Sequence, residues 1–193
     1  MKLDKKFWDS RYLNSDIGWD LGGVSTPLKK YIDQLTNKDL KIIIPGCGNA
    51  HEAEYLFNNG FKNLILIDLS PTALNLFSKR VPEFPEDQLI CEDFFKHTEK
   101  YDLMIEQTFF CAINPELRSK YAKHTSNILN FRGKLIGLLF GAELNNNKPP
   151  FGGNQKEYLN YFKPYFNINI MEIAYNSIET RKGRELFINL TKK

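Results

Sequence analysis

The sequence has few cysteines, and their arrangement indicates neither a metal site nor a disulfide framework. The chain of 193 residues contains only Cys47, Cys91 and Cys111, which are widely spaced and form no C-x-x-C pair. An odd number of cysteines at such spacing disfavours both kinds of site. We therefore expect free thiols and no bound metal.

Strong net charge and long apolar runs are also missing. The net charge is +3, and the basic residues are scattered apart from Lys192 and Lys193. Without a basic patch, no nucleic-acid partner is expected. No run approaches the roughly 18 apolar residues of a membrane span, and the charged N-terminus lacks the apolar stretch of a signal peptide. These absences predict a cytoplasmic protein without a membrane partner, and we expect a monomer.

Apolar runs and helical patterns alternate along the first two thirds of the chain. Residues 42–44, 64–67, 103–105 and 135–140 are continuous apolar runs, typical of strands buried on both faces. Helical patterns follow Asn49, Ser70 and Asn114, each a capping residue, and the first helix is expected to stop at Gly60. This order predicts a parallel sheet with helices on both faces and right-handed crossovers.

The C-terminal part has a different pattern. Residues 166–170 and 186–190 alternate apolar and polar side chains, as antiparallel strands with one wetter face do. Asparagine, proline and glycine gather in 145–153 and mark a long loop. The predicted fold class is α/β, with a mostly parallel sheet that has an antiparallel edge at its C-terminal end.

Ligands of open α/β sheets bind where the strands end, so the segments after the strands carry the site. Gly46 and Gly48 form a tight turn that opens a helix, although a plain strand-to-helix turn would look the same. Asp68 lies about twenty residues further on, where an acid accepts hydrogen bonds from ribose hydroxyls. Asp93 and Phe94 supply an acid and an aromatic ring for an adenine.

The glycine turn also restricts the nucleotide. It lacks the G-K-[ST] sequence of a triphosphate-binding loop and the third glycine of the dinucleotide pattern. A nucleoside cofactor without phosphates fits better, and S-adenosyl-L-methionine has the ribose, the adenine and the amino-acid part that these segments would hold. Polar Glu106 and Gln107 follow the apolar run at 103–105, at the same edge of the sheet.

The order and spacing of these segments resemble the thiopurine S-methyltransferase family of class I S-adenosylmethionine-dependent methyltransferases, and more closely its halide/thiol branch. The resemblance rests on residues 7–12, 18–22, 45–48, 68–74, 93–95, 108–115 with Arg118, 149–151 and 181–185. It implies a Rossmann-like single domain over residues 1–193, with a seven-stranded sheet, and a helical lid in residues 1–36.

The resemblance also implies roles for individual residues. Trp8 and Trp19 would cover the cofactor, because an aromatic face favours a sulfonium cation. Arg118 and Gln107 would act near the acceptor, and the loop 149–153 would close over it. The remaining cofactor-binding residues would be Gly46, Gly48, Asp68, Leu69, Asp93, Phe94 and Glu106.

The chemistry implied is an in-line displacement at the methyl carbon by a small-molecule acceptor, foremost a thiol. An ionised acceptor needs no base, and we expect His51, His97 and His124 to be solvent-facing or capping residues and Cys47 to be a packed turn residue. Many halide/thiol relatives have Asp-Tyr where this chain has Glu106-Gln107, so halide activity is not implied. An O- or N-methyltransferase, with Glu106 as the only candidate base, and a non-catalytic S-adenosylmethionine-binding module remain alternatives.

Overall fold

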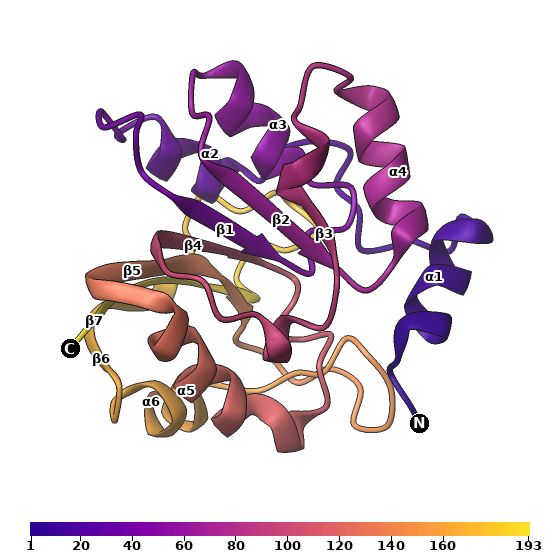
Figure 1. Cartoon of the computed structure of the whole chain (residues 1–193). Helices are drawn as coiled ribbons and strands as arrows, with labels where there is room; N and C mark the ends of the chain where they lie inside the picture. Colours follow the sequence, from indigo (N-terminus) through magenta and orange to yellow (C-terminus); the bar gives the residue numbers. More distant parts are fainter.

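The computed structural model describes residues 1–193 and contains one seven-stranded sheet (Figure 1). The strand order is β3-β2-β1-β4-β5-β7-β6. Strand β7 runs opposite to the other six strands, so β6 at the edge runs in the same direction as β1 to β5. The strands are β1 (Ile42–Pro45), β2 (Leu64–Asp68), β3 (Leu89–Cys91), β4 (Tyr101–Gln107), β5 (Leu129–Phe140), β6 (Phe166–Ile173) and β7 (Glu185–Lys192).

The four apolar runs of the sequence all form strands, which confirms the predicted parallel sheet. All of β1 is buried, and so are most of β2 and β4, because helices cover both faces. The run at 135–140 is only the second half of β5, which begins at Leu129. The antiparallel edge is confirmed, since β7 lies between β5 and β6 and runs antiparallel to both.

Two helical layers enclose the sheet. On one face lie α2 (Thr26–Ile32), α3 (His51–Asn58) and α4 (Pro71–Arg80), which share a core cluster with Ile42 and Leu66. On the other face α5 (Arg118–Ile128) and α6 (Gln155–Phe162) pack with Ile43 and Met104. Alternate residues of one strand therefore serve opposite layers. None of the helices is both long and apolar enough to cross a bilayer.

The helix ends match the sequence expectations only in part. Ser70 caps α4, since its hydroxyl accepts a hydrogen bond from the Ala73 N–H. The predicted Asn49 cap of α3 is wrong, because the Asn49 amide donates to Asp20 and Ala50 holds the cap position without a side-chain bond. Asn114 caps a 3-10 turn at Pro115–Leu117, which precedes α5.

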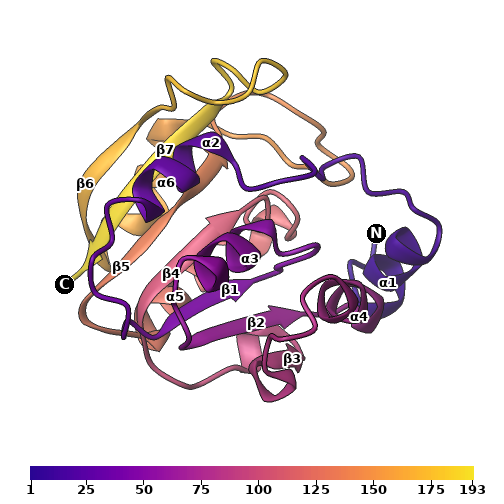
Figure 2. The same cartoon turned by 90° about the horizontal axis from the view of Figure 1, so that it is seen from above.

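The N-terminal segment divides into two parts with different surroundings. Figure 2 shows α1 (Lys5–Leu13) beside α4 and well separated from α2. Leu28 and Ile32 of α2 are fully buried in the core. The predicted lid of residues 1–36 is therefore too long, because α2 is part of a helical layer; only α1 and the segment up to Gly23 lie along the cavities described below.

Candidate active site

A cavity of about 1160 Å³ opens where β1, β2 and β4 end, between the sheet and the N-terminal segment. Typical small-molecule pockets hold roughly 300–1,000 Å³, so this one has room for a cofactor and a small acceptor together. Most of the residues predicted to bind the cofactor line it, namely Trp8, Trp19, Gly46, Asp68, Leu69, Asp93 and Phe94. The topology thus brings together residues that lie far apart in the sequence.

The turn after β1 is built around two glycines for steric reasons. Gly46 and Gly48 have φ angles of +56° and +55°, which side-chain-bearing residues rarely adopt. A Cβ atom on Gly46 would lie 2.3 Å from Cδ2 of Phe109, and one on Gly48 would lie 2.5 Å from the hydroxyl oxygen of Tyr12. Aromatic side chains therefore pack directly against both glycines, which leaves no room for a side chain at either position.

Asp68 joins this turn to the end of β2. Its Oδ2 accepts a hydrogen bond of 2.9 Å from the Gly48 N–H, and its Oδ1 accepts one of 2.8 Å from the Ser70 N–H. Burial raises the pKa of the Asp68 carboxyl, and the two N–H donors oppose that shift. Each oxygen accepts only one hydrogen bond within the protein, so acceptor capacity remains for a ligand.

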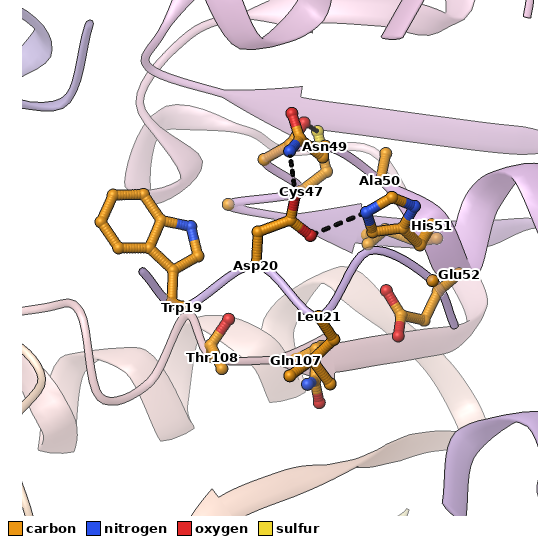
Figure 3. Close-up of a pocket in the computed structure, with 14 residues that line it drawn as sticks. Trp19, Asp20, Leu21, Cys47, Asn49, Ala50, His51, Glu52, Gln107 and Thr108 are labelled. Atoms are coloured by element: carbon orange, nitrogen blue, oxygen red, sulfur yellow. Dashed lines mark hydrogen bonds and ion pairs between the residues drawn. The ribbon is translucent and has the colours of Figure 1, made fainter. Parts of the chain in front are cut away.

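A second, small pocket of about 40 Å³ adjoins the glycine turn (Figure 3). In it the carboxylate of Asp20 lies 2.5 Å from Asn49 Nδ2 and 2.7 Å from His51 Nε2. Gly48 and Gln107 also line this pocket. The Gln107 Oε1 atom is buried without a hydrogen-bond partner, so its capacity to accept a hydrogen bond is unused within the protein.

The histidines have surroundings that the sequence did not reveal. His51 pairs with Asp20, a residue that we had not singled out although it lies inside the motif at 18–22. His97 is buried with Nδ1 2.6 Å from Glu92 and Nε2 2.6 Å from Tyr101. His124 is half-buried with its ring against Phe94. None of the three is fully solvent-facing, because each ring has a partner in the fold; His97 is nevertheless a capping residue, at the C-terminal end of the 3-10 turn Phe94–Lys96.

The three thiols are free, and two of them lie at the site. Cys47 lines the small pocket and Cys111 the large cavity. Burial raises the pKa of Cys47 well above its usual range and that of Cys111 to about 12. Neither is a thiolate at neutral pH, which agrees with the expectation of a packed residue at position 47.

Arg118 does not face either cavity, which corrects its predicted place near the acceptor. Its side chain is 2% exposed. Nη1 donates to Glu157 over 2.9 Å, and Nη2 donates to the Gly152 carbonyl over 2.9 Å. The guanidinium also lies over the ring of Phe110. Arg118 therefore anchors the loop before α6, and only residues earlier in that loop, Leu144 and Lys148–Pro150, line the large cavity.

The predicted contact between Glu106 and the cofactor is also corrected, because Glu106 lines neither cavity. Its fully buried carboxylate accepts hydrogen bonds from the Phe109 and Phe110 N–H groups, of 2.8 and 3.0 Å, and from the Tyr121 hydroxyl over 2.6 Å. Burial raises its pKa to about 7. It cannot contact a cofactor there, and it is not free to act as a base for the acceptor.

The wall of the large cavity also contains cations that the sequence interpretation did not single out. Lys148, Arg181 and Arg184 line it together with apolar Phe140 and Ile178. The guanidinium of the buried Arg181 donates to Glu185 over 3.1 Å and to the Trp19 carbonyl over 2.6 Å, so it ties the N-terminal segment to β7. In the sequence, the motif at 181–185 contains Arg181 and Arg184 and was the only signal for these cations.

Comparisons with known proteins agree with this geometry. The sequence profile of the Thiopurine S-methyltransferase (TPMT) family matches residues 3–190. The chain is 26% identical to "Probable thiol methyltransferase 2" of Arabidopsis thaliana over 92% of this chain and 81% of that protein. It is 28% identical to "Thiocyanate methyltransferase 1" of Brassica oleracea over the same shares of the two chains.

Solved structures show the same architecture. Magnesium protoporphyrin IX methyltransferase of Synechocystis PCC 6803, solved with bound SAH, superposes with a TM-score of 0.74 and 13% identity, covering 98% of this chain and 100% of that one. The seven-stranded sheet is that of class I methyltransferases. The chain therefore belongs to the thiopurine S-methyltransferase family and is an S-adenosyl-L-methionine-dependent methyltransferase that acts on small molecules.

Proposed function

We propose that this protein transfers the methyl group of S-adenosyl-L-methionine to a small organic thiol. The observation that carries the proposal is the part of the cavity wall formed by Phe140, Lys148, Ile178 and Arg184, which combines apolar side chains with cations and which we assign as the acceptor end; no histidine lines the cavity. The names of the thiol and thiocyanate methyltransferases to which the chain is similar support a sulfur acceptor.

The residues at the strand ends have the chemistry that the cofactor needs. We assign the ribose hydroxyls to Asp68 and the adenine to Leu69, Asp93 and Phe94, all of which line the cavity. The amino-acid part would lie along Gly46 and Gly48, with its ammonium group at the unpartnered Oε1 of Gln107. Gln107 is thus assigned to the cofactor rather than to catalysis.

Two tryptophans cover the reacting end. The rings of Trp8 and Trp19 meet edge to face with centroids 5.8 Å apart, and both line the cavity. Aromatic faces attract a sulfonium cation and exclude water. Arg181 holds the Trp19 backbone in place, so we propose that α1 and the segment through Gly23 form the lid.

We infer that the acceptor arrives already ionised, because no histidine lines the cavity and its carboxylates belong to the N-terminal segment and to the segments assigned to the cofactor. The Glu106 carboxylate is buried and bonded, and His51 pairs with Asp20 in the smaller pocket. A thiol loses its proton near pH 8.5, well before a phenol or an alkylamine does near 10. Lys148 and Arg184 at the acceptor end would lower that value further. An O- or N-methyltransferase lacks the base that it would need here.

With the cofactor bound, its sulfonium supplies an activated methyl carbon. The protein then has to align the thiolate opposite the departing sulfur and exclude water, which accounts for several kcal/mol of the barrier. Lys148–Pro150 in the loop before α6 and the two tryptophans of the N-terminal segment all line the cavity. We assign the alignment of the thiolate and the exclusion of water to these residues. The cytoplasmic location, the monomeric state and the single domain over residues 1–193 stay predictions.

The test is S-adenosylhomocysteine release with matched acceptors that differ only in the reacting atom. We expect turnover with thiophenol and with alkyl thiols, and none above background with phenol or with the alkylamines that match the alkyl thiols. Thiocyanate and iodide in the same panel separate a thiol enzyme from a halide enzyme. Methylation of phenol or of an alkylamine at a rate comparable to that of the matching thiol would overturn the sulfur assignment, as would binding of S-adenosylhomocysteine without turnover on any thiol.

A further inference from the structure

The turn that follows β4 forms one wall of both cavities and has a strained backbone. Gln107 and Thr108 line the small pocket, and Thr108, Phe109 and Cys111 line the large cavity. Thr108 has a φ angle of +59°, a left-handed conformation that is unfavourable for a β-branched residue. Contacts elsewhere in the fold must therefore hold this turn in place.

Glu106 supplies those contacts. One of its carboxylate oxygens accepts hydrogen bonds from two successive N–H groups of the turn, those of Phe109 and Phe110. The residue opposite on β5 is Gly137, where a Cβ atom would lie 2.4 Å from Cβ of Glu106. Because residue 137 has no side chain, the sheet leaves space for the Glu106 side chain. This side chain bends back under the turn and is fully buried.

Tyr121 of α5 completes the arrangement. Its hydroxyl donates to the second carboxylate oxygen of Glu106 over 2.6 Å. Its ring packs against Phe94, Phe109 and Phe110, with centroids 5.7, 5.9 and 5.0 Å away. Phe94 follows β3 and Phe109 covers Gly46, so this one buried pair is linked to two of the segments that surround the cofactor site.

We propose that Glu106, together with Tyr121, is a positioning residue for methyl transfer. The pair holds the turn 107–111 in the strained conformation that places Phe109 over Gly46 and the Gln107 amide at the small pocket. The inference rests on the cofactor-binding residues assigned under the proposed function. It concerns cofactor affinity and needs no particular acceptor.

The test compares Glu106→Gln and Tyr121→Phe with a matched control, Tyr101→Phe. Tyr101 is also a fully buried tyrosine, and its hydroxyl bonds to His97 at the far end of β4. All three variants lose buried polar contacts and some thermal stability. Calorimetric titration with S-adenosylhomocysteine, well below the melting temperature, then measures the cofactor site without any acceptor.

We expect Glu106→Gln and Tyr121→Phe each to raise the S-adenosylhomocysteine Kd by about 5- to 20-fold, the effect of losing one charge-assisted hydrogen bond. The double variant should be less than additive, because the two residues share one bond. Tyr101→Phe should bind within twofold of the wild type. In turnover assays the KM for S-adenosylmethionine should rise more than kcat falls.

Binding within twofold of the wild type for both variants, with a loss of stability like that of Tyr101→Phe, would overturn the proposal. If Glu106→Gln does not fold, Tyr121→Phe alone carries the test, since it removes a single oxygen atom. If no thiol is methylated, the proposed acceptor is wrong. The S-adenosylhomocysteine binding measurement still tests the role of Glu106 and Tyr121, because it needs no acceptor.

Discussion

The ring of Phe109 lies against the backbone of Gly46, so close that a Cβ atom on residue 46 would lie 2.3 Å from Cδ2 of the ring. Gly46 directly follows β1 and Phe109 lies two residues after β4, and these two strands are adjacent in the sheet. The contact therefore requires both the strand pairing and the turn that Glu106 holds.

Gly46→Ala should abolish measurable binding of S-adenosylhomocysteine. The new methyl group would collide with Phe109, and the φ of +56° disfavours any side chain. The matched control is Gly60→Ala at the end of α3, where φ is +89° but no atom lies within 4 Å of the added Cβ. That variant should lose about 1 kcal/mol of stability and bind normally. Normal binding by Gly46→Ala would contradict the assignment of the turn.

Asp68→Asn should weaken S-adenosylhomocysteine binding by about tenfold or more, because a charge-assisted acceptor for the ribose hydroxyls is lost. Asp102→Asn is its control. Asp102 also accepts a backbone N–H, that of Lys41, but lies near the start of β4, away from the cavity. Equal effects of the two substitutions on the Kd, measured by calorimetry, would show that Asp68 acts only on the fold.

Arg118→Met should destabilise the protein by about 1–3 kcal/mol, since the carbonyls of Phe151 and Gly152 lose a charged donor. Because Arg118 does not line the cavity, its removal should leave S-adenosylhomocysteine binding unchanged. Urea unfolding and calorimetry measure the two effects separately. A fall in kcat/KM for the thiol without any loss of stability would restore Arg118 to the acceptor site.

Glu106 should make the free energy of unfolding depend on pH. Its pKa is raised from 4.5 to about 7 in the folded protein, so between these values the folded state binds more protons than the unfolded state. The contribution of Glu106 to stability is therefore largest below pH 4.5 and falls as the pH rises through about 7. Glu106→Gln should flatten this part of the profile, measured by urea unfolding from pH 5 to 8. An unchanged slope would contradict the raised pKa.

The strand-forming runs and the positions after them could be predicted because local patterns decide them. Strands buried on both faces need continuous apolar residues, as at 42–44 and 103–105, whatever their neighbours are. The capping hydroxyl of Ser70 acts within three residues. Once parallel strands are placed, their carboxyl ends share one edge, so Gly46, Asp68 and Asp93 had to meet there.

Charged side chains were the residues that the sequence interpretation misplaced. Arg118 and Glu106 are polar residues beside the predicted site, and their types suit either ligand contact or a buried network. Their actual partners, the Gly152 carbonyl and the Tyr121 hydroxyl, lie 34 and 15 positions away in the sequence. No pattern within a helix or a turn contains that information.

The sequence by itself thus determined the fold class, the family and the segments that surround the cofactor, because these depend on local periodicity and on motifs in a recognisable order. The tertiary structure alone decided which of the polar side chains face the cavity and which hold it together. A carboxylate or guanidinium must find partners when it is buried, and packing between distant segments chooses those partners. For that reason Gln107 lies in a pocket wall, while its neighbour Glu106 is buried under the turn.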